Sequence, residues 1–373
     1  MDTILEALGP LTVTDRALIA IALFVIAFAV ATAVVSLVTG WRAALAILGA
    51  LLVGAVLAVA FWPVDTDGLR SSPDPATGYD DALARFAEDR AALPELNPLC
   101  EPQILDHGRK VERVVVLIHG VSSCPRAFVD FAPLLHERGY NVVTALLPQN
   151  GLADRATDAL SRTTAEELAR FGDRTVDVAA GLGDEVTVLG ISAGANVAAW
   201  VAQNREDVSR AVLVAPFFGL GSFGPRLNGV LMRAMLLLPD ISMWKDPVAR
   251  ENATGGMAHA YLRQSTRATG EIMRLGLATY REAQERPPAA GDIGVIMNDA
   301  DTAVSNATTR AVMRVWERDG ATLFSYVFDA GHALGHELID PEEPGADPAL
   351  TYPVILQFIE DPASFDPASV PAP

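Results

Sequence analysis

The chain has 373 residues, half of them hydrophobic, and a formal net charge of −18. Nucleic acid is excluded as an expected partner, because binding to phosphates requires clustered Lys and Arg. The 6 His and 2 Cys show neither Cys-x-x-Cys nor His-Glu-x-x-His spacing, so the sequence predicts no metal site and no cofactor. The length allows one large domain with an appendage, or two domains.

The N-terminal residues 1–62 hold most of the hydropathy of the chain. Two segments within them, 17–39 and 43–62, contain no charged residue. Each is about long enough to cross a bilayer core of ~30 Å as a helix, so we expect a hairpin of two transmembrane helices. The charged residues before the first segment are mostly acidic, with Asp2, Glu6 and Asp15 against Arg16, which disfavours a signal peptide. Arg42 lies in the turn, and the positive-inside rule then places the following domain outside the cytoplasm, at a cell membrane.

Residues 63–99 are rich in Pro, Asp and Ala, and they predict a linker with one short helix at 80–92. Beyond it, over residues 100–365, apolar runs of strand length alternate with helical patterns; residues 366–373 form a tail. The predicted strands are 113–118, 141–146, 185–189, 211–215, 293–297 and 322–328. The predicted helices are 127–138, 164–181, 193–204, 302–319 and 349–359. This alternation predicts an α/β domain with a doubly wound, mostly parallel sheet.

Residues 216–291 interrupt the alternation. They carry no clear strand and include the apolar sequence LNGVLMRAMLLLPDISMW at 227–244. We expect a helical cap insertion above one edge of the sheet. Loops at the carboxyl ends of parallel strands form the sites of such folds, so the cap would cover the site.

The strongest functional motif is Gly190-Ile191-Ser192-Ala193-Gly194, between a predicted strand and a predicted helix. In that context Gly-x-Ser-x-Gly is typical of a nucleophile elbow, a sharp turn that presents the Ser above the sheet. An ordinary small-residue turn gives the same letters. The Ser becomes a nucleophile only when a His accepts its proton and an acid orients that His.

Both partners have candidates further along the chain, in the order that this fold uses. Asp299 and Asp301 follow a predicted strand, and we favour Asp301 as the acid, although capping of the next helix is the alternative. His332 and His336 follow the last predicted strand. The residues alone leave open which of the two is the base.

An oxyanion requires two backbone N–H donors. The first is that of Ala193, directly after the nucleophile. The second is that of Val121, which follows His119-Gly120 at the end of an early strand. We predict that His119 orients this loop and is not the base.

At these residues the chain resembles the serine α/β-hydrolases, in particular the carboxylesterase and monoacylglycerol-lipase-like branch. The resemblance covers roughly residues 100–360 and is carried by LIHGVSSCPRAF, VTVLGISAGANVAAWVAQ, DADTAV and GHELIDP. It implies an α/β-hydrolase fold and cleavage of a small-molecule ester with an apolar acyl chain. It also implies Asp301 as the acid and His336, in a His-acidic-Leu-Ile-Asp-Pro block, as the base. The chain departs from the family at Pro148-Gln149-Asn150-Gly151, where Pro-x-His-Gly is frequent.

Two questions have alternative answers in the sequence: which reaction the triad catalyses, and in which compartment the domain lies. The same triad would serve a thioesterase, an amidase or an acyltransferase, whereas an inactive hydrolase fold used for binding would need no triad. Cys100 and Cys124 flank the first strand of the domain, either as a disulfide or as two free thiols. A disulfide would require an oxidising compartment, in agreement with an extracytoplasmic domain.

Overall fold

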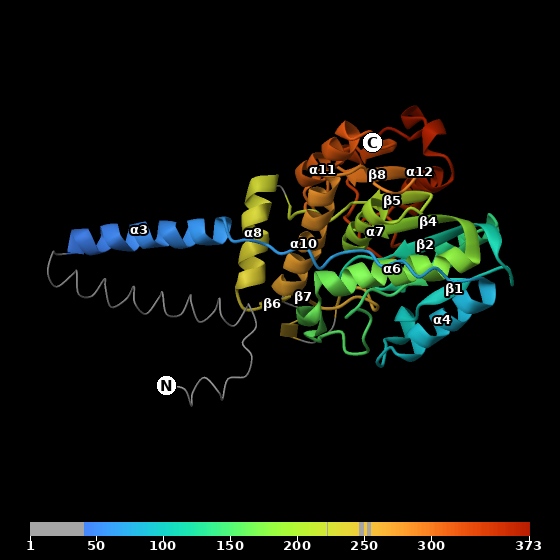
Figure 1. Cartoon of the computed structure of the whole chain (residues 1–373), viewed down its shortest axis with the longest axis horizontal. Helices are drawn as coiled ribbons and strands as arrows, with labels where there is room; N and C mark the ends of the chain where they lie inside the picture. The colour runs from blue at the N-terminus through green and yellow to red at the C-terminus, as the bar shows by residue number, and fades with distance from the viewer. Residues whose placement is uncertain (1–40, 222, 246–249, 252–254) are drawn as a thin grey trace.

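The computed structural model describes residues 41–221, 223–245, 250–251 and 255–373. The first expected transmembrane segment, 17–39, lies outside the described residues. The second corresponds to helix α3 (Trp41–Ala60), which projects from the body of the molecule beside α8 (Pro225–Leu237; Figure 1). Within the described ranges, no helix combines the length and the apolarity that crossing a membrane requires.

The centre of the molecule is a seven-stranded sheet with the order β1-β3-β2-β4-β5-β8-β9 (Figure 1). All neighbouring strands are parallel except β1, which runs antiparallel to β3 at one edge. The mostly parallel sheet predicted from the sequence is confirmed. The strands are β1 (Gln103–Leu105), β2 (Val111–Ile118), β3 (Asn141–Ala145), β4 (Gly183–Ile191), β5 (Arg210–Val214), β8 (Asp292–Asn298) and β9 (Leu323–Phe328).

Both faces of the sheet are covered, which explains the uninterrupted apolar runs. Successive residues of a strand point to opposite faces. Accordingly, Val114 and Val116 belong to one core, whereas Val115 and Leu117 belong to the other. The first core holds side chains of α6 (Ala165–Leu182), α7 (Ala193–Asn204), α10 (Thr266–Ala283) and α11 (Asn306–Arg318). The second core holds side chains of α5 (Phe131–Glu137) and α12 (Pro348–Glu360).

The insertion 216–291 contains more than helices. Besides α8 and α10 it holds two three-residue strands, β6 (Ser242–Trp244) and β7 (Arg263–Ser265), which pair antiparallel. We expected no strand there. The strands are too short to show an alternating pattern in the sequence, so only their pairing reveals them.

Residues 63–99, expected to be a linker, pack on the body instead. Leu69 is fully buried, and its carbonyl oxygen accepts a hydrogen bond of 3.0 Å from Trp200 Nε1. Further on, the segment forms α4 (Tyr79–Ala91), which lies against α6. The composition, rich in Pro, Asp and Ala, is that of a linker, but here Ser71 Oγ and the backbone N–H groups of Ser72 and Asp74 find buried acceptors far away in the sequence.

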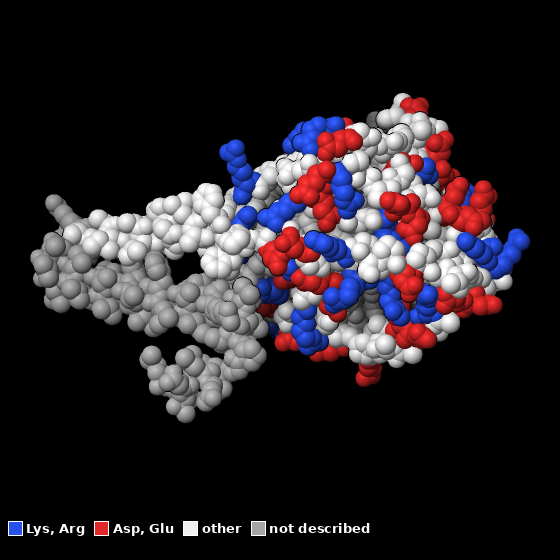
Figure 2. Space-filling view, viewed as in Figure 1, with Lys and Arg blue, Asp and Glu red and all other residues white. Residues whose placement is uncertain are grey.

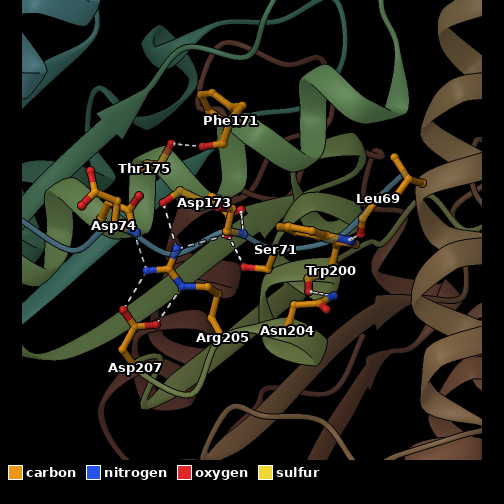
Figure 3. Close-up of polar contacts among 12 residues, drawn as sticks. Leu69, Ser71, Asp74, Phe171, Asp173, Thr175, Trp200, Asn204, Arg205 and Asp207 are labelled. Carbon is orange, nitrogen blue, oxygen red and sulfur yellow. Dashed lines mark hydrogen bonds and ion pairs between the residues drawn. The ribbon is translucent and has the colours of Figure 1, made fainter. Parts of the chain in front are cut away.

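The centre of this attachment is Arg205, whose side chain is fully buried (Figure 3). Its guanidinium donates five hydrogen bonds, to Asp173, Asp177 and Asp207. The same Asp173 accepts hydrogen bonds from Ser71 Oγ and from the backbone N–H of Ser72, and Asp177 accepts one from that of Asp74. The extended chain is therefore fixed to α6 through carboxylates that Arg205 neutralises.

The start of this segment is fixed to the cap. Arg233 of α8 donates to the carbonyl oxygen of Trp62 at 2.8 Å. Arg274 and Arg281 of α10 donate to the carbonyl oxygens of Asp65 and Val64, at 2.7 and 2.8 Å. These bonds attach the end of α3 to the same helices that form the cap.

Candidate active site

Ser192 sits on a strained turn at the carboxyl end of β4. Its backbone has φ 56° and ψ −117°, a region that costs a non-glycine residue about 1–3 kcal/mol. The flanking glycines are required by space. A Cβ on Gly190 would lie 2.1 Å from the carbonyl oxygen of Gly194, and one on Gly194 would lie 2.2 Å from that of Ile118. The turn therefore has the geometry of a nucleophile elbow.

Asp301 and His336 are in direct contact. Asp301 follows β8, and its side chain is 1% exposed. Its Oδ1 accepts hydrogen bonds from the backbone N–H groups of Ala303 and Val304, and its Oδ2 lies 2.6 Å from His336 Nδ1. A carboxylate that accepts from Nδ1 leaves Nε2 of the ring as the basic nitrogen.

The electrostatics around His336 favour its protonated form. Burial lowers the pKa of the imidazole, but the hydrogen bond to Asp301 and the negative charges of Glu337 and Asp301 outweigh burial and raise it above its ordinary value. The ring is therefore held in a position where it can take up a proton readily.

The alternative base, His332, and the alternative acid, Asp299, contact other residues. His332 ends a short 3-10 turn, and its ring lies edge-on to Phe328 with the centroids 6.3 Å apart. It does not line the cavity that holds Ser192. Asp299 is half exposed and forms an ion pair of 3.3 Å with Arg310.

Ser192 and His336 line the same cavity, whose volume is about 510 Å³. Among the described residues no hydrogen bond joins these two side chains; in enzymes without substrate such bonds are often long and shorten when substrate binds. One part of the wall is apolar and includes Val121, Leu160, Phe217, Leu220, Phe223 and Met257. The other part is polar and includes Lys245, Gln264, Glu337 and Glu343.

The expected lid, the apolar segment 227–244, does not line this cavity. The cap contributes residues on either side of it, from Phe217 to Phe223 and from Lys245 to Thr269. Helix α8 packs against α10 instead. Its Met232 belongs to the first core, whereas its Leu227 is exposed. The sequence could not show which neighbour the apolar residues of α8 would meet.

Of the two expected oxyanion donors, Val121 lines the cavity, and Ala193 directly follows Ser192 in the chain. Ala193 is the first residue of α7, so its N–H has no partner within the helix. Val121 lines the cavity beside Ser192. The loop that carries Val121 is held by His119, whose Nε2 accepts from the N–H of Leu147 at 3.0 Å. Its Nδ1 therefore donates to the carbonyl oxygen of Gly120 at 2.7 Å. Burial lowers the pKa of His119 to about 4, so the ring is neutral near pH 7.

Two residues with a place at this site were missed in the sequence. Asn150 Oδ1 accepts a hydrogen bond of 2.7 Å from the N–H of Ser122 and thereby positions the loop of Val121. The only signal was the departure from the family at this stretch. Glu337 follows His336, and one of its carboxyl oxygens would lie 2.7 Å from a Cβ placed on Gly120. Burial raises the pKa of Glu337 to about 7, and within the described part of the chain its second oxygen has no hydrogen-bond partner.

The loops around the site are cross-linked. Cys100 and Cys124 form a disulfide with their Cα atoms 5.3 Å apart, and both residues are buried. His259 and Asp340 are also fully buried, and His259 Nε2 lies 2.8 Å from the carboxylate of Asp340. The first link ties the start of the domain to the Val121 loop, and the second ties the cap to the loop after His336. Among the described residues, no group of three or more His, Cys, Asp or Glu side chains is arranged to hold a metal ion.

Three solved structures share the fold at low identity. A metagenome-derived lipolytic enzyme from a study of LipS and LipT has a TM-score of 0.52 and 17% identity, over 71% of this chain and 99% of that one. A monoacylglycerol lipase from Paleococcus ferrophilus has a TM-score of 0.50 and 15% identity, over 71% and 99%. A soluble variant of monoglyceride lipase from Saccharomyces cerevisiae, solved with a substrate analogue, has a TM-score of 0.52 and 15% identity, over 69% of this chain and 90% of that one.

No curated protein matches the sequence. The sequence profile of the alpha/beta hydrolase family matches residues 115–346, which span the sheet from β2 onward, the elbow of Ser192 and the dyad of Asp301 and His336. Since this match covers more than half of the chain and the fold agrees with it, the chain belongs to the alpha/beta hydrolase family.

Proposed function

We propose that the protein hydrolyses carboxylic esters with Ser192 as nucleophile, His336 as base and Asp301 as the group that orients the base. The observation that carries the proposal is the placement of Ser192, on its strained elbow, in one cavity with a histidine whose Nδ1 is held by a buried carboxylate. The solved structures with this fold include lipolytic enzymes and monoglyceride lipases, which supports the same reaction class.

In the proposed mechanism His336 Nε2 removes the proton of Ser192 Oγ as that oxygen attacks the ester carbonyl carbon. The N–H groups of Val121 and Ala193 donate to the resulting oxyanion. The tetrahedral intermediate expels the alcohol, which takes the proton from His336, and leaves an acyl group on Ser192. A water molecule, deprotonated by His336, then releases the acid by the same path.

The wall of the cavity suggests the substrate class. Its apolar part suits an apolar acyl chain, and its volume lies in the range of pockets for small molecules. His336 must protonate the leaving alcohol, so the alcohol lies on the side of His336, whose charged neighbours include Glu337 and Glu343. A small-molecule ester with an apolar acyl chain fits both conditions.

A fluorophosphonate probe tests the nucleophile. We expect the full-length protein to be labelled and to release p-nitrophenol from a p-nitrophenyl ester, and the Ser192→Ala variant to do neither. Ser209→Ala, at an exposed position before β5 that does not line the cavity, is the matched control and should be labelled like the wild type. Equal labelling of wild type and Ser192→Ala would refute the proposal, as would no labelling of the wild type.

We further propose that residues 1–62 attach the protein to a membrane, with the hydrolase domain outside the cytoplasm. Support for attachment comes from the surface of α3, which is free of charge along most of its visible length, unlike the body (Figure 2). Its exposed apolar residues include Leu45, Leu52, Val53, Val56 and Leu57. The apolar surface continues directly after the helix at Phe61, which is 81% exposed. The disulfide supports the side of the membrane, because disulfides persist in oxidising compartments.

Extraction and thiol labelling test the two parts of this proposal. The protein should remain with membranes in alkaline carbonate, and removal of residues 1–62 should release it. The unreduced protein from cells should show no free thiol. Release of the full chain by carbonate would overturn the attachment, and two reactive thiols would overturn the placement.

A further inference from the structure

A second cavity lies between α4 and α6, beside the carboxyl end of β3. Its volume is about 660 Å³, larger than that of the cavity at Ser192. No member of the proposed triad lines it. Its floor is apolar and includes Phe86, Leu93, Leu147 and Phe171, which come from both helices and from the connections that follow α4 and β3. A cavity of this size with an apolar floor has room for a lipid-sized chain.

The rim of this cavity is basic in a chain that is acidic overall. Two acidic residues, Asp89 and Glu167, line it together with four arginines: Arg90, Arg162, Arg170 and Arg174. Four positive charges against two negative charges leave a local excess of two, whereas the whole chain carries −18. An apolar floor beneath a positive rim is complementary to an amphiphile with an anionic head.

Two of the arginines are free to bind such a head. Arg90 is paired with Glu101 at 3.0 Å, and Arg174 is paired with Asp89. Arg162 and Arg170 are exposed, and neither forms an ion pair with any residue in the described ranges. Arg162 donates only a long hydrogen bond, of 3.3 Å, to the amide oxygen of Gln149.

We propose that this cavity binds a long-chain carboxylate, with the hydrocarbon chain on the apolar floor and the carboxylate at Arg162 and Arg170. A guanidinium presents a planar fork of N–H donors that matches the two oxygens of a carboxylate. Burial of the hydrocarbon chain contributes about 25 cal/mol for each Å² of apolar surface removed from water. Neither contribution involves Ser192, so the binding does not depend on the proposed reaction.

The ligand class also has a place in the proposed chemistry. Hydrolysis of an ester with a long acyl chain releases a long-chain carboxylate, so the cavity would hold the product class of that reaction. Gln149 and Asn150 line this cavity, and Asn150 also holds the N–H of Ser122 in the oxyanion loop. The two sites therefore share one connecting segment.

Fluorescence titration with cis-parinaric acid tests the proposal on the full-length Ser192→Ala protein, which removes turnover. We expect saturable binding of one equivalent. The double variant Arg162→Glu/Arg170→Glu should bind the acid about tenfold or more weakly, because it loses the charge-assisted hydrogen bonds to the carboxylate. A tenfold loss corresponds to about 1.4 kcal/mol of binding free energy. The methyl ester of the probe, which lacks the anionic head, should bind the unchanged cavity more weakly than the acid.

Two controls separate this site from other apolar surfaces. Arg314→Glu/Arg318→Glu makes the same change in net charge at exposed positions of α11 and should leave the affinity unchanged. Leu220→Trp, which fills part of the cavity at Ser192, should also leave it unchanged. Equal affinity for acid and methyl ester, equal affinity of the Arg162/Arg170 variant, or loss of binding in the Leu220 variant would each overturn the proposal.

Discussion

The buried cluster around Arg205 and the cavity around Ser192 are both rich in polar side chains, but they differ in how fully these are hydrogen-bonded. Arg205 donates five hydrogen bonds, which equals the number of N–H groups in a guanidinium. At the cavity, by contrast, an oxygen of Glu337 and the hydroxyl of Ser123 are buried and have no hydrogen-bond partner among the described residues.

At these two places we interpret the difference as one between a structural role and a functional role. A buried polar group without a partner costs about 1–3 kcal/mol, so folding alone does not favour it. The cluster of Arg205 lies where the chain is fixed to α6 and has its hydrogen bonds complete. The groups at the cavity remain open to a ligand that can complete them. Three substitutions test this contrast.

His336→Ala should have the largest effect, and it should appear in catalysis. Loss of the base lowers kcat by roughly 10⁶-fold in enzymes with this triad. His332→Ala is the matched control, because His332 does not line the cavity, and it should stay within about twofold of the wild type. Rates of p-nitrophenyl ester hydrolysis measure both variants. Full activity of the His336 variant would show that another group accepts the proton.

Arg205→Leu should have the next largest effect, and it should appear in stability. Removal of one partner from a buried ionic cluster lowers the free energy of unfolding by about 3–5 kcal/mol, because the remaining charges, here Asp173 and Asp177, lose their compensation. Chemical denaturation of the full-length protein measures the change. Arg318→Leu, which breaks an exposed pair with Asp319, is the control and should change little. If the two variants are equally stable, the cluster does not hold residues 71–74 in place.

Glu337→Gln should have the smallest effect, and it should depend on pH. Burial raises the pKa of Glu337 from 4.5 to about 7 in the folded protein, with His336, Asp340, Glu343 and Lys245 as the charged neighbours. Between these two values the folded chain binds more protons than the unfolded chain. The free energy of unfolding of the wild type therefore falls as the pH rises through that window.

The Glu337→Gln variant lacks the carboxyl group that causes this fall in the free energy of unfolding. We expect it to match the wild type near pH 4 and to exceed it by about 1–2 kcal/mol near pH 8, a value reduced because Glu337 as a residue is only half-buried and lines the cavity. Denaturation curves at several pH values measure the difference. Glu317→Gln, at an exposed position of α11, should show no such trend. Parallel pH profiles for wild type and the Glu337 variant would contradict an elevated pKa at this residue.

Much of the sheet was predictable because its strands are buried on both faces. Six predicted strands correspond to β2, β3, β4, β5, β8 and β9, and their continuous apolar runs reflect the two cores. The missed strands β1, β6 and β7 have three residues each, too few to show a period. The segment 63–99 was misjudged because Ser71, Ser72 and Asp74 donate hydrogen bonds to Asp173 and Asp177, more than a hundred positions away. Arg205 binds the same two carboxylates.

The sequence by itself determined the mostly parallel sheet and the elbow. Local spacing suffices for both: burial on two faces requires unbroken apolar strands, and the turn at Ser192 leaves no room for a Cβ at Gly190 or Gly194. Only the tertiary structure decided which groups meet at the cavity. The contact of His336 with Asp301 joins the loops after β8 and β9, and Glu337 meets Gly120 from a distant part of the chain. Such contacts depend on how strand ends are placed in three dimensions, which residue spacing along the chain does not encode.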